Sequence, residues 1–164
     1  MKRASLLFTL LVLLAVYPAL VHAEGLEKKF TTRYAAINYS EDKDMDDFIW
    51  HLGGQKLEFT NDTALASSRV DRIIERVENI LDMRPGNFKV NIALKRGKLE
   101  GERVAFYEYK TKTISISVDY ATDGVFAHEV AHALIHHNFG TLLPSKMQEI
   151  LTQYVDKALY NDYY

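Results

Sequence analysis

The chain contains no cysteine among its 164 residues, so disulfide bonds cannot stabilise it. The same absence excludes a lipid-modified cysteine near the N-terminus. With 48% hydrophobic residues, the chain is long enough for one domain with a substantial core and too short for two. We therefore expect a single domain whose stability depends on packing or on a bound metal.

The sequence also lacks an excess of positive charge. Its 20 basic residues stand against 22 acidic ones, and without Lys2 and Arg3 the remaining 18 basic residues leave a net charge near −4 with neutral histidine. Proteins that bind nucleic acid usually carry a basic surface, so we expect no nucleic-acid partner. Internal repeats, low-complexity tracts and Pro/Ser-rich linkers are also missing, which favours one continuous fold from Gly25 to Tyr164.

The N-terminus has the pattern of a secretory signal peptide. Two basic residues precede an apolar run from Ala4 to Val21, and the small residue Ala23 follows. We expect residues 1–23 to be a signal peptide and residues 24–164 to be an exported domain, periplasmic or secreted, with no membrane anchor after cleavage. The alternative is an uncleaved anchor, because the apolar run is close to the shortest that spans a bilayer.

Hydrophobic periodicity predicts an α+β fold. Strands are expected over 30–39, 88–94, 104–109 and 114–118, the last three as a meander, and helices over 41–53, 61–81, 122–139 and 144–160. The third helix is apolar nearly all round, which predicts that it is buried with its histidines inside the protein. Apolar residues at helical spacing predict the core stripe of the last helix: Met147, Ile150, Leu151, Tyr154, Val155 and Ala158.

One motif indicates chemistry. Residues 128–132 read His-Glu-Val-Ala-His, an H-E-x-x-H on the predicted buried helix. A spacing of four places both imidazoles on one helical face, where they can bind one Zn²⁺. Glu129 would then lie beside the water activated by the metal. The alternative, two core histidines with a paired glutamate, would bury several polar groups that each need a partner.

A catalytic zinc site needs a third protein ligand. His136 is a poor candidate, because its Cα lies roughly 12 Å along a straight helix from that of His128. His137 and His136 are better explained as charges near the helix C-terminus or as residues that support the ligands. Glu149, on the next helix, lies opposite the apolar stripe, which suits a ligand facing a cleft and equally suits a solvated side chain. Periodicity leaves this choice open.

The last helix resembles the glutamate helix of gluzincin metallopeptidases of the peptidase MA-like group, whose pattern is roughly P-x-W-L-x-E-G-L-A-x-Y. The matching residues are Pro144, Met147, Glu149, Leu151 and Tyr154, whereas Lys146, Ile150 and Thr152 differ. With the H-E-x-x-H helix, the resemblance extends from about Asp62 to Tyr160. It implies a zincin-like α+β fold with a small, mostly antiparallel or mixed sheet, a backing helix, an active-site helix and a glutamate helix.

The resemblance also implies a function. A zinc-dependent metallopeptidase would bind Zn²⁺ through His128, His132 and Glu149, and Glu129 would be the general base. Tyr154 would stabilise the oxyanion, with Tyr160, Tyr163 and Tyr164 as alternatives. A peptide or protein substrate would pair with an edge strand near Ile114 to Val118.

Three other readings remain open at this point. The substrate of a zinc hydrolase could be a cell-wall peptide or another amide. The chain could be an inactive or latent zincin-fold binding module of the cell envelope, with a terminus occupying the cleft. Zinc could also be purely structural, held by a fourth ligand such as His136. Glu129 argues against that last reading, since a structural site needs no base.

Overall fold

The computed structural model describes residues 27–53 and 58–161, so the predicted signal peptide lies outside the described residues. These ranges form an α+β fold, which confirms the expected class. Its elements are β1 (Lys28–Thr31), β2 (Ala35–Tyr39), α1 (Asp42–His51), α2 (Thr63–Leu81), β3 (Val90–Lys95), the 3₁₀ helix η1 (Glu100–Glu102), β4 (Ala105–Glu108), β5 (Thr113–Ser117), α3 (Asp123–Phe139) and α4 (Ser145–Asn161). Within the two described ranges, none of the helices has the length and apolar character needed to cross a membrane.

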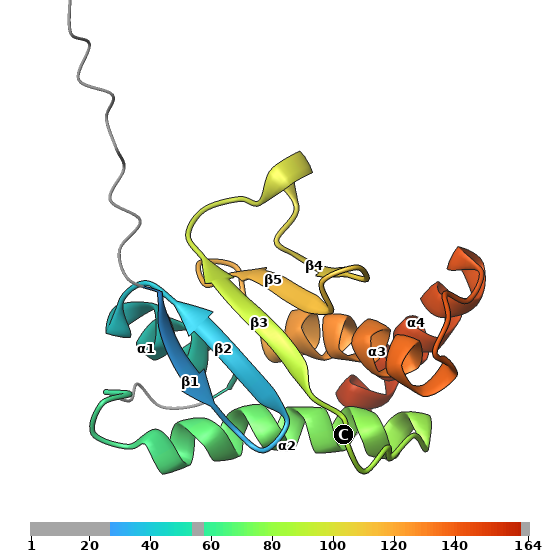
Figure 1. Cartoon of the computed structure of the whole chain (residues 1–164), viewed down its shortest axis with the longest axis horizontal. Coiled ribbons are helices and arrows are strands. Elements are labelled where there is room, and N and C mark those ends of the chain that lie inside the picture. The colour runs from blue at the N-terminus through green and yellow to red at the C-terminus, as the bar shows by residue number, and fades with distance from the viewer. Residues whose placement is uncertain (1–26, 54–57, 162–164) are drawn as a thin grey trace, which may run out of the picture.

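The five strands form one mixed sheet in the order β1-β2-β3-β5-β4 (Figure 1). β3 pairs in parallel with both β2 and β5, whereas β4 pairs antiparallel with β5. The expected meander is therefore wrong, and so is the expectation that residues 114–118 form an edge. Alternation predicts which face of a strand is buried and not which strands are neighbours, so it could not give this order. β5, inside the sheet, carries the fully buried Ile114 and Ile116, whereas the short β4 at the edge leaves Glu108 exposed.

The single strand expected over 30–39 is two strands joined by a tight turn. Thr32 makes this turn, because its hydroxyl accepts hydrogen bonds from the backbone N–H groups of Tyr34 and Ala35, at 3.2 Å and 3.0 Å. Asp71 of α2 accepts from the backbone of Arg33 and Tyr34 as well. The sequence has no glycine or proline at this position, so the turn signal that sequence reasoning looks for is missing.

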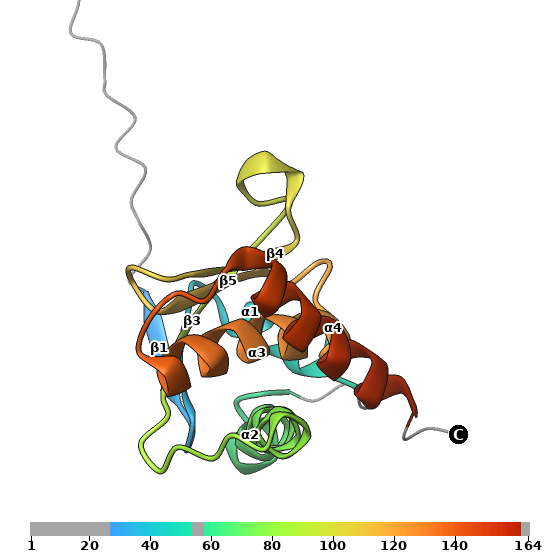
Figure 2. The ribbon, with the colours of Figure 1, turned by 90° about the vertical axis from the view of Figure 1, so that its right-hand side faces the viewer.

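The helices cover one face of the sheet. Figure 2 shows α3 between the sheet and α2, with α4 packed against α3. The Thr122 hydroxyl caps α3 by accepting from the Val125 N–H, and Gly140, in the left-handed conformation at φ 65°, ends the helix. α3 is buried on most of its surface, as its all-round apolar sequence predicts. The motif histidines therefore lie on the central helix of the fold.

The core stripe expected for α4 is wrong in most of its members. Met147, Ile150 and Tyr154 are 50%, 58% and 56% exposed, and of the expected stripe only Val155 is fully buried. The buried face of α4 is instead half polar, formed by Gln148, Thr152, Val155 and Leu159. The buried Gln148 amide has partners on both sides, since its Oε1 accepts from the Tyr109 hydroxyl and its Nε2 donates to the Leu143 carbonyl.

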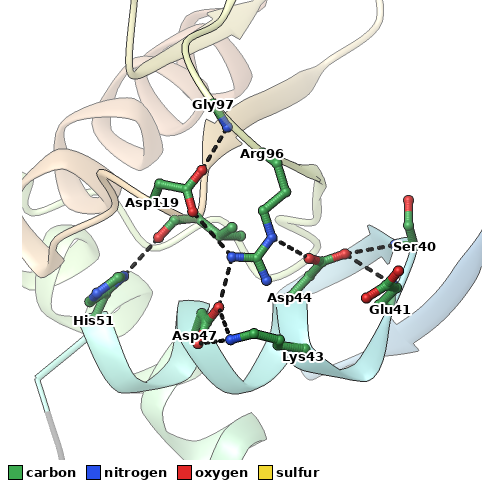
Figure 3. A network of polar contacts seen from close by, with 10 residues as sticks. Ser40, Glu41, Lys43, Asp44, Asp47, His51, Arg96, Gly97 and Asp119 are labelled. Atoms are coloured by element: carbon green, nitrogen blue, oxygen red, sulfur yellow. Dashed lines mark hydrogen bonds and ion pairs between the residues drawn. The ribbon is translucent and has the colours of Figure 1, made fainter.

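Arg96, directly after β3, joins α1 to the connection between β5 and α3 (Figure 3). Its Nε donates to Asp44 at 2.8 Å, and its Nη1 donates to Asp47 at 2.7 Å and to Asp119 at 3.1 Å. Asp119 also accepts from the Gly97 N–H at 2.6 Å. Since α3 begins at Asp123, this network fixes the segment that leads into the motif helix.

Candidate metal centre

The structure brings the three predicted metal ligands together. His128 and His132 lie one turn apart on α3 with ring centroids separated by 5.0 Å, and α4 places Glu149 beside them. One ligand atom from each of the three residues lies within 4.8 Å of the other two. The choice that periodicity left open is thus answered by geometry: Glu149 faces the histidines.

The spacing of these atoms suits a metal better than it suits a direct contact. Nε2 of His132 and Oε1 of Glu149 are 3.6 Å apart, which is too long for a good hydrogen bond. Two ligands about 2 Å from one tetrahedral zinc would be roughly 3.3 Å apart. Two imidazoles and one carboxylate are also the donor set of open zinc sites. The residues present therefore fit a zinc ion.

His132 is poorly satisfied without a cation. It is buried, and within the described residues its Nδ1 has no hydrogen-bond partner. Burial, followed by the neighbouring His128, lowers the pKa of His132, while Glu149 opposes this effect. The imidazole is therefore neutral near pH 7, which is the form that binds a metal.

Asp156 orients His128, a role that sequence reasoning missed. Nδ1 of His128 lies 3.1 Å and 3.3 Å from the two carboxylate oxygens of Asp156. This contact places the imidazole hydrogen on Nδ1 and leaves Nε2 free for a metal, as second-shell carboxylates do. The available signal was the spacing of seven from Glu149, which places both carboxylates on one face of α4.

Glu129 lies at the junction of α3 and the edge strand β4. Burial raises the pKa of its carboxyl group; His128 and then a hydrogen bond from the backbone N–H of Tyr107 oppose this shift, while Glu149 adds to it. The net direction is upward, toward the range in which a carboxylate accepts and returns a proton near neutral pH. The position predicted for the general base is therefore suitable for that role.

The histidines that sequence reasoning set aside as ligands have other partners. His136 Nδ1 is 3.0 Å from the Tyr107 hydroxyl, and His137 Nε2 is 3.2 Å from the Asn87 side-chain oxygen. Neither belongs to the group of ligand atoms around His128.

Tyr154 lies on a different face of α4 from Glu149. It is more than half exposed, and its position five residues after Glu149 places it about 140° around the helix axis. Its role in stabilising an oxyanion stays a prediction from the resemblance. Tyr109, which sequence reasoning did not single out, lies nearer the carboxylates: burial, then Glu129 and Glu149, raise its pKa, and its hydroxyl donates to Gln148 at 2.5 Å. The side chains of Tyr160, Tyr163 and Tyr164 lie outside the described residues.

A cleft of about 370 Å³ opens beside the first histidine. His128, Glu129 and Asp156 form its polar side, and the remaining wall is small or apolar: Val104, Thr122, Gly124 and Val125. A substrate in this cleft would therefore contact the general-base candidate and an apolar surface together.

Comparison with protein-family models, curated proteins and solved structures gave no match. The case for a function accordingly rests on the residues of this site.

Proposed function

We propose that the chain is a zinc-dependent metallopeptidase of the gluzincin type. His128, His132 and Glu149 would bind the metal, and Glu129 would be the general base. The observation that carries the proposal is the convergence of two imidazoles and a carboxylate within 4.8 Å, beside a partly buried glutamate in a cleft. A purely structural site would have no use for the cleft or for a glutamate with a raised pKa.

The chemistry divides between metal and protein. When bound, zinc would polarise the scissile carbonyl and acidify a water molecule. Glu129 would take a proton from that water as its oxygen attacks the carbonyl carbon, and would give the proton to the nitrogen of the leaving amine as the C–N bond breaks. Asp156 would hold the imidazole of His128 in the metal-binding tautomer throughout.

An extended peptide would lie along β4, the strand at the edge of the sheet, and not along β5. The Tyr107 N–H donates to Glu129, so it points away from β5. In an antiparallel pair, the backbone groups of successive residues point alternately toward and away from the neighbouring strand, so the backbone of Ala105 also points away from β5. The backbone of Ala105 would hydrogen-bond to the substrate backbone, and the apolar wall of the cleft would take one of its side chains.

The proposal includes export. Residues 1–23 would be removed as a signal peptide, and residues 24–164 would act in the periplasm or outside the cell.

The test is Glu129→Gln, which keeps the size of the side chain and removes the base. We expect the variant to bind as much zinc as the wild type and to lose hydrolysis of a mixed peptide library by about 10² to 10⁴-fold. Glu100→Gln, a change at an exposed carboxylate on η1, is the matched control and should have no effect on either measurement.

Full activity of Glu129→Gln would remove the assignment of the base. A wild type that binds one zinc and cleaves no peptide would favour the alternative of an inactive or latent zincin-fold binding module.

A further inference from the structure

A second cavity, of about 180 Å³, lies at the C-terminal end of α3. The N-terminal ends of β3 and β5 lie on the same side of the molecule as this end of the helix (Figure 1). The side chains that matter here are Lys89, Lys112, Tyr107, His136 and His137. None of them lines the cleft beside His128, so the two cavities are separate sites.

The lining of this cavity is basic. Two lysines and two histidines line it and, among the residues that the structure describes, no carboxylate does, in a chain whose net charge is −2. Lys89 comes directly before β3, and Lys112 directly before β5. Lys112 has a φ of 52°, a backbone conformation that glycine or asparagine adopts at lower cost. Both lysines are exposed at the cavity, and within the described residues neither forms an ion pair, so an anion bound between them could interact with both charges.

Tyr107 gives His136 a defined tautomer. Burial raises the pKa of Tyr107 to about 12, so the phenol keeps its proton. The hydroxyl lies 3.0 Å from Nδ1 of His136, and we assign the protonated phenol as the donor in this contact. A neutral imidazole that accepts at Nδ1 carries its hydrogen on Nε2. His136 thus adds an N–H donor to the two lysines without needing a positive charge of its own.

We propose that this cavity binds a small oxyanion, a carboxylate or phosphate group, through Lys89, Lys112 and the Nε2–H of His136. Charge-assisted hydrogen bonds from lysine and a neutral N–H donor are the contacts that such groups form in proteins. The cavity has room for a small tetrahedral anion together with water. The two sources of such a group are free inorganic phosphate and the terminal carboxylate of a peptide.

The experiment follows the histidine ring signals of the purified protein by NMR at pH 7.5 during titration with three probes. The probes are inorganic phosphate, an N-acetylated dipeptide with a free carboxylate, and the C-terminal amide of that dipeptide. We expect saturable shifts of the His136 and His137 signals with phosphate, with the carboxylate peptide or with both, and none with the amide. His51, whose Nδ1 bonds to the Val118 carbonyl, is the internal reference and should not move.

The lysines are tested by Lys89→Gln combined with Lys112→Gln. This variant should bind the anion more weakly by about tenfold for each lysine. Lys29→Gln combined with Lys110→Gln removes the same charge from exposed positions outside the cavity and should leave the affinity unchanged. Failure of both anions to saturate the two rings, equal shifts with the peptide amide, or unchanged affinity in the Lys89 and Lys112 variant would overturn the proposal. The anion that binds more tightly identifies the source.

Discussion

Replacement of Asp156 should weaken metal binding without removing a ligand. Its carboxylate, with 35% of its side chain exposed, lies 3.1 Å from Nδ1 of His128. Partners of this kind typically change metal affinity by 10 to 100-fold, which corresponds to about 1.4 to 2.7 kcal/mol. Partial exposure favours the lower half of that range, since water can replace part of the contact. We therefore expect roughly 10 to 30-fold weaker zinc binding for Asp156→Ala.

Competition with a chromophoric chelator measures this affinity directly. Asp156→Asn keeps an oxygen that can accept from Nδ1 and loses the charge, so its affinity should fall between those of the wild type and Asp156→Ala. Gln153→Ala, an exposed change on the same helix, is the control for an effect on α4 itself. Wild-type affinity in both Asp156 variants, or an equal loss in Gln153→Ala, would refute the orienting role.

Two further predictions concern the folded scaffold and the oxyanion. Arg96→Met should lower the free energy of unfolding by about 1 to 2 kcal/mol, because it breaks three partly exposed contacts to carboxylates. Hydrogen bonds from Arg96 lower the pKa of Asp47, and hydrogen bonds from Gly97 and Arg96 lower the pKa of Asp119. The stability that these contacts contribute is therefore present above the unfolded pKa of about 3.9. It is lost as the pH falls through the lower pKa values of the folded state. Urea unfolding at pH 7 and pH 3 should show the difference between wild type and variant shrinking in acid, and a constant difference would contradict the network. If Tyr154 has the role that the resemblance assigns to it, Tyr154→Phe should lower kcat about 10²-fold, and an unchanged kcat would remove that role.

The sequence was sufficient for the parts of the fold that local patterns encode. The hydrophobic periodicity of α2 and the all-round apolar character of α3 predicted both helices, and the structure confirms them. Strand order was not predictable in this way, because alternation shows which residues are buried and not which strands are neighbours. The turn at Thr32 was missed since a single hydroxyl replaces the usual glycine or proline signal.

The site residues also divide into those that a local sequence pattern predicts and those that depend on how the helices pack. The H-E-x-x-H spacing places two candidate ligands and a candidate base within one helix, so His128, Glu129 and His132 could be named from sequence. Glu149 and Asp156 depend on how α4 is rotated against α3. The apolar stripe of α4 suggested that Met147 and Ile150 face the core, yet both are exposed, and Gln148 and Thr152 are buried instead. The general tendency of apolar residues to be buried does not predict this rotation of α4.

The most direct test of the central claim is the zinc content of a purified protein of residues 24–164, measured by elemental mass spectrometry for the wild type beside Glu149→Ala. The three-ligand site predicts close to one zinc per chain in the wild type and a clear loss in the variant. No zinc in either protein after reconstitution, or equal zinc in both, would contradict the site as described.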